Sequence, residues 1–216
     1  MIKYVFWDFN GTILDDRNLC LKLLNELLKT ENKDPITYKK YLDIFGFPIK
    51  DYYKKAGLLF KYQTFEEMSE WFISVYQPLS LKLSLYDGVV DTLNKIKDMN
   101  INNVCLSASN KDNLKEQIKH YKITNLFKDI LGTDNVLALG KLDVAKKYVK
   151  EQNINKDNAL LIGDTNADYE LAKSLGFKCV LFTNGHQSKK RLMSLDALTI
   201  DNIKDLINII KGENKK

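Results

Sequence analysis

The sequence predicts an α/β protein, built as a doubly wound parallel sheet with an all-helical segment inserted after the first strand. Short apolar runs rich in β-branched and aromatic residues alternate with helical patterns, as expected when crossover helices join parallel strands. One long interval, from about residue 15 to residue 85, breaks this alternation because it contains helical patterns and no convincing strand. The 216 residues are enough for a core domain and an insertion of this size.

The expected strands are nearly continuous apolar runs, which is typical of parallel strands that are buried on both faces. They are expected at residues 4–7, 103–106, 129–131, 159–162 and 179–182. Helices are expected at residues 111–121, 142–152, 166–174 and 203–210. Gly176 would end the third of these helices, since glycine readily adopts the left-handed conformation found at helix C-termini.

The helical interval is expected to form a domain of residues 15–85, while residues 1–14 and 86–216 form the core domain. Leu19, Leu23 and Leu27 recur at helical spacing near its start. Phe65 and Phe72 do so near its end. These spacings predict amphipathic helices that pack against one another.

Composition and charge favour an intracellular protein. Lys and Arg outnumber Asp and Glu by 33 to 28; the net charge of +5 is modest and spread out, so nucleic acid is not an expected partner. No apolar run approaches the roughly 18 residues that cross a bilayer, so no membrane association is expected. Three cysteines without paired spacing, Cys20, Cys105 and Cys179, are expected to be buried and reduced. We therefore expect a cytoplasmic protein, either a monomer or a homodimer.

Polar clusters follow several of the expected strands. In an open parallel sheet, ligands bind beyond the carboxyl ends of the strands, where these clusters would meet at one edge. A lysine also opens the helix before the fourth strand. The segments are Asp8-Phe9-Asn10-Gly11-Thr12, Ser107-Ala108-Ser109-Asn110, Lys141 and Gly163-Asp164-Thr165-Asn166-Ala167-Asp168.

Each cluster also has an ordinary structural explanation. The first is typical of a turn, Ser107 suits a strand end, and Lys141 is one lysine among many. Asp164 and Asp168 suit the N-terminus of a helix, although like charges four residues apart repel each other. A bound cation would relieve that repulsion. The combination, in this order and at strand ends, is what indicates a functional site.

In order and position, these segments resemble the four motifs of the haloacid dehalogenase-like hydrolases. The similarity extends from about residue 4 to residue 210 and implies a Rossmann-like core. The helical interval resembles the small helical cap of the phosphoglycolate phosphatase and β-phosphoglucomutase branches. Tyr86-Asp87-Gly88-Val89 is similar to the segment by which those caps rejoin the core, and Leu142 replaces the proline that commonly follows the lysine.

The resemblance implies a Mg²⁺-dependent phosphatase that acts on a small phosphorylated metabolite. Asp8 would be a nucleophile that becomes transiently phosphorylated, because a carboxylate can divide a difficult displacement into two easier ones. Mg²⁺ prefers oxygen ligands. Those implied are the carboxylates of Asp8, Asp164 and Asp168 and the backbone carbonyl of Asn10.

The same resemblance implies donors for the charge on the phosphoryl oxygens. Catalytic roles are implied for Asp8, Asn10 and Lys141, and Thr12 would support the first loop. The phosphate-binding residues implied are Asn10, Gly11, Ser107, Ala108 and Lys141.

Asn10 departs from the pattern of the family's phosphatases, which usually carry a second aspartate here. That aspartate protonates the leaving oxygen and then activates water. An amide cannot transfer a proton at neutral pH, and a general acid or base typically contributes about 10² to 10⁴-fold. A glycolate or sugar alkoxide would therefore leave poorly, whereas an acyl phosphate, phosphoanhydride or aryl phosphate needs less help.

Three explanations for Asn10 remain open. In the first, the enzyme is slow or confined to substrates with activated leaving groups. In the second, another residue, such as His186, supplies the proton. In the third, the reaction is not the hydrolysis of a phosphate monoester. The last includes C–P or C–halogen hydrolysis, and a C–P hydrolase would need a Schiff-base lysine such as Lys50, Lys54 or Lys55. A phosphate-binding protein with little turnover is a further alternative. His186 and His120 are themselves expected to be surface residues.

Overall fold

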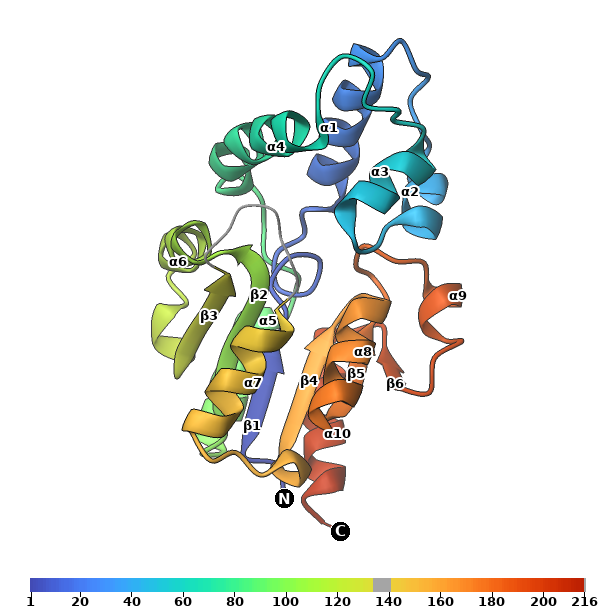
Figure 1. Ribbon diagram of the computed structural model, residues 1–216. Coiled ribbons are helices and arrows are strands. Elements are labelled where there is room, and N and C mark those ends of the chain that lie inside the picture. Colours follow the sequence, from blue (N-terminus) through green and yellow to red (C-terminus); the bar gives the residue numbers. More distant parts are fainter. Residues whose placement is uncertain (134–140, 216) are drawn as a thin grey trace.

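The computed structural model describes residues 1–133 and 141–215. Their strands form one six-stranded sheet in the order β3-β2-β1-β4-β5-β6, in which every neighbouring pair is parallel (Figure 1). The expected fold class is therefore confirmed. The strands are β1 (Tyr4–Trp7), β2 (Asn102–Asn110), β3 (Asp129–Thr133), β4 (Ala159–Gly163), β5 (Lys178–Phe182) and β6 (Leu198–Ile200).

Helices cover both faces of the sheet. The helices outside the insertion are α5 (Val89–Asp98), α6 (Lys111–His120), α7 (Leu142–Glu151), α8 (Asn166–Leu175), α9 (Lys189–Leu192) and α10 (Leu206–Glu213), with short 3₁₀ turns η1 (Thr124–Leu126), η2 (Lys156–Asn158) and η3 (Ile203–Asp205). Residues of α7 and α8 pack on the face that carries Phe6. Residues of α5, α6 and α10 pack on the opposite face, which carries Val5 and Trp7.

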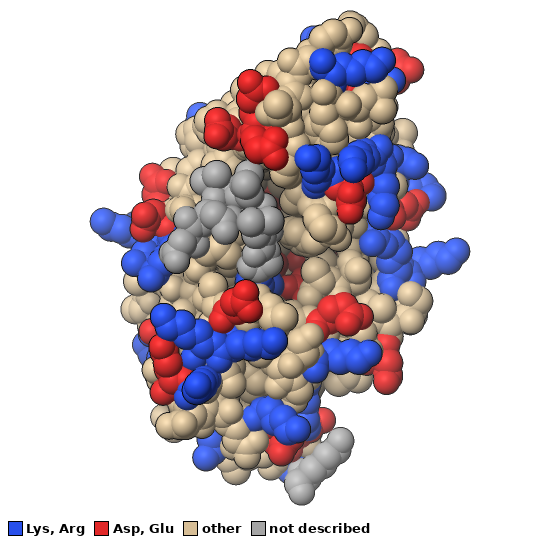
Figure 2. All heavy atoms as spheres, in the orientation of Figure 1, with Lys and Arg blue, Asp and Glu red and all other residues tan. Residues whose placement is uncertain are grey.

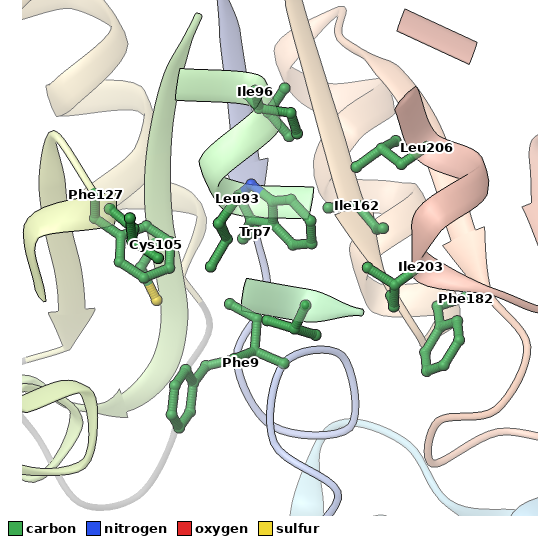
Figure 3. Close-up of a cluster of buried hydrophobic side chains, with 14 of the residues drawn as sticks. Trp7, Phe9, Leu93, Ile96, Cys105, Phe127, Ile162, Phe182, Ile203 and Leu206 are labelled. Carbon is green, nitrogen blue, oxygen red and sulfur yellow. The ribbon is translucent and has the colours of Figure 1, made fainter. Parts of the chain in front are cut away.

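The larger of the two cores is centred on Trp7. Because side chains alternate along a strand, Val5 and Trp7 point together toward α5 and α10. The Trp7 indole lies beside Leu93 and Ile96 of α5 (Figure 3). Its N–H donates a 2.9 Å hydrogen bond to Asn103 Oδ1, so the polar edge of the buried ring is satisfied.

Between β1 and α5 the chain forms four helices, α1 (Arg17–Thr30), α2 (Tyr38–Ile44), α3 (Ile49–Ala56) and α4 (Phe65–Ser80), hereafter the helical insertion. The insertion lies at the carboxyl ends of the strands (Figure 1). It has a hydrophobic cluster of its own, which includes Leu24, Leu28 and Tyr52. The expected amphipathic helix is confirmed, since Leu19, Leu23 and Leu27 are among the buried residues of α1. That residues 15–85 form a separate domain stays a prediction.

Several elements differ from expectation. β2 continues to Asn110 through an irregularity in its pairing with β3, so the cluster from Ser107 lies within the strand rather than after it. The expected helix at 203–210 begins as η3 and continues as α10 to Glu213. α5 and β6 were not expected. β6 has only three residues and an exposed Leu198, too short a pattern to show alternation.

All three cysteines are free thiols. Cys105 is buried as expected, but Cys20 and Cys179 are only partly buried, so full burial was wrong for these two. Cys20 lies on α1, and Cys179 lies near the start of β5. In the described part of the chain, no helix combines the length and apolarity needed to cross a membrane.

Candidate active site

The first strand delivers Asp8 to the carboxyl edge of the sheet. The Asp8 N–H donates to the Ile162 carbonyl at 2.9 Å, which continues the pairing of β1 with β4 one residue beyond the strand. Lys141, just before α7, forms ion pairs with Asp8 and with Asp168, the latter at 2.7 Å. These side chains are 12%, 10% and 3% exposed for Asp8, Lys141 and Asp168. One strand end and two helix starts thus converge on one charge cluster.

Three carboxylates in this cluster can share one cation. An oxygen of each of Asp8, Asp164 and Asp168 lies within 4.8 Å of the others. Hard cations such as Mg²⁺ bind carboxylate oxygens. Thr12 Oγ1 donates to Asp164 Oδ1 at 3.0 Å, which ties the first loop to the residue after β4. The donor set therefore fits a magnesium site.

The electrostatics of the cluster favour such a cation. Burial raises the pKa of Asp8 well above its usual range; Lys141 opposes this shift, and Asp168 and Asp164 add to it. Burial also raises the pKa of Asp164 to about 6, although His186 acts in the opposite direction. A bound divalent cation reverses such shifts because it stabilises the ionised carboxylates.

Glycines allow the close approach of three segments around Asp164. Gly185 follows β5, and a Cβ at this position would lie 2.1 Å from the Asp164 Cβ. The next residue, His186, donates its backbone N–H to Asp164 Oδ2 at 2.6 Å. Gly11 has φ of +77°, and its Cβ would lie 2.5 Å from Asp164 Oδ2. Larger residues at either glycine would displace Asp164.

Asp168 has a structural role and a role in the cluster at once. Thr165 is the N-cap of α8, and its backbone N–H and hydroxyl both donate to Asp168 Oδ2, at 3.1 and 2.7 Å. Asp168 Oδ1 faces the Lys141 ammonium at 2.7 Å. The capping box thus orients the second oxygen toward the site.

Asn10 has hydrogen-bond partners at both ends of its amide. Its Nδ2 donates to Asp16 Oδ2 at 3.0 Å and to the Tyr76 hydroxyl at 2.6 Å. Its Oδ1 accepts from Ser109 Oγ at 2.9 Å and from Ser107 Oγ at 3.5 Å. Asn10 therefore links the helical insertion to β2 and carries no acidic proton.

A cavity of about 840 Å³ lies between this cluster and the helical insertion. Asp8, Lys141 and Asp168 line one side, and residues of α1, α3 and α4 line much of the rest. Figure 2 shows the surface hollowed near this junction, with atoms of acidic residues visible inside the hollow. On the face shown, acidic and basic side chains lie interspersed around the hollow.

A model of the haloacid dehalogenase-like hydrolases matches residues 5–182. The chain belongs to this family. It is 24% identical over 213 residues to phosphoglycolate phosphatase 1 of Pseudomonas aeruginosa. The aligned region covers 95% of this chain and 78% of that protein. It is 22% identical over 202 residues to the phosphoglycolate phosphatase of Rhodobacter capsulatus, and this alignment covers 92% of this chain and 90% of that protein. The expected family and the expected enzyme class, a hydrolase, are confirmed.

Solved structures of other proteins share the fold of this hydrolase. A protein from Clostridium acetobutylicum, described as a predicted phosphatase, has a TM-score of 0.82 at 20% identity, covering 98% of this chain and 99% of that one. A haloacid dehalogenase-like hydrolase from Streptococcus pneumoniae has a TM-score of 0.80 at 18% identity, covering 96% and 98%. The similarity spans the helical insertion as well as the sheet.

In this hydrolase, the residues expected at strand ends are brought together, and their roles stay predictions. Ser107 and Ala108 line the cavity. The Gly11 N–H donates to Asp16 Oδ1 and to the Leu14 carbonyl, both at 3.0 Å, so binding phosphate would require this amide to exchange partners. Among the lysines considered for a Schiff base, Lys50 lines the cavity, whereas Lys54 forms an exposed ion pair with Asp51.

The surface position expected for His186 was wrong. Its side chain is 4% exposed, and Nε2 lies 3.1 Å from Asp16 Oδ1. Nδ1 is 2.5 Å from the Tyr41 hydroxyl, and the Phe45 ring stacks on the imidazole with centroids 4.5 Å apart. His120, the other histidine, is exposed at the end of α6 as expected.

The ion pair of Asp16 with His186 is the part of the site that sequence reasoning missed. Burial alone would lower the pKa of His186, but Asp16 outweighs it and raises the pKa to about 9. Burial alone would raise the pKa of Asp16, but His186 holds it below the usual value. One signal was present, because Gly185-His186 comes three residues after the fifth strand, at the same edge of the sheet as the other clusters.

Proposed function

We propose that this hydrolase is a Mg²⁺-dependent phosphatase that acts on a small phosphorylated metabolite through an aspartyl phosphate on Asp8. One observation carries the proposal: the buried Asp8 carboxylate is paired with Lys141 and lies within 4.8 Å of Asp164 and Asp168. Such a carboxylate can attack phosphorus once its charge is offset by neighbouring cations. The matched phosphoglycolate phosphatases support the same reaction class.

Lys141 would bind the transferring phosphoryl group. Burial would lower its pKa, but Asp168 and Asp8 outweigh burial and raise it, so the ammonium stays charged throughout the neutral range. The hydroxyl of Ser107 and the backbone amide of Ala108 would add neutral donors on the β2 side. Thr12 would keep Asp164 oriented through its 3.0 Å hydrogen bond.

The residues that would hold Mg²⁺ are Asp8, Asp164 and Asp168, with the backbone carbonyl of Asn10. Mg²⁺ bound there supplies charge neutralisation for the phosphoryl oxygens. The raised pKa values of Asp8 and Asp164 support this assignment, because these buried carboxylates are costly to ionise without a cation.

A second candidate function, binding of a phosphorylated ligand with little turnover, rests on Asn10. The amide donates to Asp16 and Tyr76 and accepts from Ser109, so it neither protonates a leaving group nor activates water. In this case a phosphorylated Asp8 would form and persist.

The experiment measures phosphate release from acetyl phosphate and p-nitrophenyl phosphate, together with the mass of the acid-quenched protein. We expect Mg²⁺-dependent release and a phosphoryl adduct on the peptide that contains Asp8. Asp8→Asn should reduce release by at least roughly 10³-fold, as loss of a nucleophile does elsewhere. Asp15→Asn is the matched control, because Asp15 pairs with Arg17 outside the cavity.

The outcomes separate the candidates. Release that survives Asp8→Asn or chelation contradicts the phosphatase proposal. A stable phosphoryl adduct without continuing release would favour the ligand-binding alternative.

A further inference from the structure

The cavity beside the phosphoryl site has two chemically different sides. Its floor is formed by charged and hydroxyl side chains, including Asp8, Lys141 and Ser107. The side contributed by the helical insertion is dominated by aromatic and aliphatic residues. Those that matter here are Leu24, Phe45, Phe47, Phe65, Phe72 and Ile73. A phosphate monoester bound with phosphorus at Asp8 would direct its leaving group toward this second side.

The volume does not match a two-carbon leaving group. About 840 Å³ lies within the range of roughly 300–1,000 Å³ typical of pockets that enclose drug-sized ligands. A glycolate group would leave most of the aromatic surface in contact with water. An apolar leaving group would instead cover that surface, and burying apolar area is the main favourable contribution to binding.

The charge on this side also disfavours a carboxylate. Among the described lining residues, Lys50 is the cation that the insertion contributes, and its Nζ lies 5.5 Å from the Phe65 ring centroid. Glu66, at the start of α4, lines the same cavity with the opposite charge. His186 also lines the cavity, but its Nε2 is paired with Asp16 Oδ1 at 3.1 Å. A single lysine does not give a carboxylate the bidentate partners that bind it best.

Asn10 restricts the leaving group independently of its size. Its Nδ2 donates hydrogen bonds to Asp16 and Tyr76, and its Oδ1 accepts one from Ser109. The amide therefore has no acidic proton to give to a leaving group. An alkoxide departs slowly without protonation, whereas a phenolate is a weak enough base to depart unprotonated. The aromatic walls select an apolar group, and the amide selects a weakly basic one.

We propose, on the basis of the phosphatase function above, that the substrate is an aryl phosphate whose ring occupies the side of the cavity formed by the helical insertion. An Asp8 oxygen bonds to phosphorus, and the phosphorus–aryl oxygen bond breaks. The aryl oxygen keeps the electron pair and takes a proton from solvent to give the phenol. Water then displaces Asp8 from phosphorus and returns one proton to solvent, which leaves inorganic phosphate and the free carboxylate.

The experiment compares kcat/KM for five phosphates on the full chain with Mg²⁺. They are 2-naphthyl, phenyl and cyclohexyl phosphate, 2-phosphoglycolate and, as a small activated reference, acetyl phosphate. Phenol and 2-naphthol have similar acidity, so their comparison isolates ring contact, and we expect naphthyl to exceed phenyl by roughly tenfold or more, mainly through KM. Cyclohexyl phosphate fills a similar space to phenyl but should fall roughly 10²-fold or more below it, mainly in kcat.

A matched pair of variants on α4 tests the location of the ring. Ile73→Ala removes a residue that lines the cavity and should reduce the ratio of naphthyl to phenyl turnover severalfold. Leu79→Ala removes the same number of carbons from the same helix, at a residue that does not itself line the cavity and packs on the cluster of Leu19, Leu23 and Tyr76, and should leave the ratio unchanged. A ratio within one variant does not depend on how much of that variant is folded.

Two failures are distinguishable. Turnover of acetyl phosphate with 2-phosphoglycolate equal to or better than phenyl phosphate, or with no advantage for the naphthyl ring, overturns the aryl substrate and leaves the phosphatase intact. No phosphate release from any of the five overturns the proposed function and the substrate with it.

Discussion

Asn10 stands at a position where three parts of the chain meet: the first loop, β2 and the helical insertion. Asn10→Asp would place a carboxylate beside Asp16, whose Oδ2 now accepts from the amide at 3.0 Å. Like charges this close disfavour ionisation, so the new carboxyl would retain its proton near neutral pH. We expect turnover of cyclohexyl phosphate to rise by up to about 10² to 10⁴-fold, with a smaller effect on aryl phosphates.

The same substitution at Asn18, an exposed residue of α1, provides the control and should leave both substrates unaffected. If Asn10→Asp raised aryl and alkyl turnover equally, proton transfer to the leaving group would not be what limits this enzyme.

The pair of His186 with Asp16 should appear in the pH dependence of stability. Although burial lowers it, Asp16 raises the pKa of His186 from an ordinary value near 6.5 to about 9 in the folded state. The stabilisation from this group is therefore complete below about pH 6.5 and is lost as pH rises through about 9. Denaturant unfolding with a chelator present should show the free energy of unfolding falling by a few kcal/mol across this interval.

His186→Gln should flatten this part of the pH profile. His120→Gln is the matched control at an exposed histidine and should retain the wild-type slope. An unchanged slope in His186→Gln would mean that the imidazole is not protonated in the folded protein.

Among individual residues, the sequence predicted those whose position in the site follows from topology alone. Asp8 and Asp164 each come directly after a parallel strand, and the carboxyl ends of such strands share one edge. Asp16 and His186 depend instead on packing, because Tyr41 and Tyr76 of the helical insertion complete their environment. Contacts between residues 145 positions apart, as for Tyr41 and His186, leave no periodic pattern in the sequence.

Among the elements, α4 and α8 both begin with a capping box, formed by Thr64 with Glu67 and by Thr165 with Asp168. Thr→Val at either position removes the capping hydroxyl and should lower the free energy of unfolding by about 1 kcal/mol. Only Thr165→Val should also lower kcat, because Asp168 Oδ1 contacts Lys141. Urea unfolding and steady-state kinetics on both variants check this.

Equal losses of activity in the two variants would show that α8 capping has no special connection to the site. The comparison is matched in chemistry, since each variant replaces a threonine hydroxyl that accepts the N3 amide of its helix, at 3.1 Å in α4 and 3.3 Å in α8.

Element prediction succeeded for the buried strands. The five expected strands are all present, because buried parallel strands read as continuous apolar runs. α5 was missed although Val89, Leu93 and Ile96 are buried at helical spacing. The extension of β2 beyond Leu106 was missed because Ser107 and Ser109 are polar and their pairing with β3 is irregular.

For the whole molecule, cation binding should couple to folding. A ligand that binds only the folded state stabilises it by about 2.7 kcal/mol at a concentration of 100 times its dissociation constant. For a chain of this size each kcal/mol raises Tm by about 2–4 °C, so saturating Mg²⁺ should raise Tm by several degrees. Thermal unfolding with Mg²⁺ and with a chelator measures this shift.

Asp164→Asn should abolish the Mg²⁺-dependent rise in Tm, and Asp15→Asn should preserve it. A shift that persists in Asp164→Asn would assign the binding to another part of the surface. Whether the protein is a monomer or a homodimer stays a prediction, which the sedimentation of these samples would decide.

A few hydrogen bonds connect the helical insertion to the rest of the chain, and each of these two parts contributes one side of the cavity. The Gln187 amide and the Arg191 guanidinium donate to the Phe45 carbonyl at 2.9 and 2.7 Å, and the Asn10 amide donates to the Tyr76 hydroxyl at 2.6 Å. In the proposed mechanism, Asp8, Asn10 and Lys141 lie outside residues 24–73, whereas the apolar side chains that would contact the leaving group lie within them. Substitutions within residues 24–73 would therefore change the apolar side of the cavity while leaving Asp8, Asn10 and Lys141 in place, so the proposal predicts altered substrate preference with the phosphoryl chemistry retained.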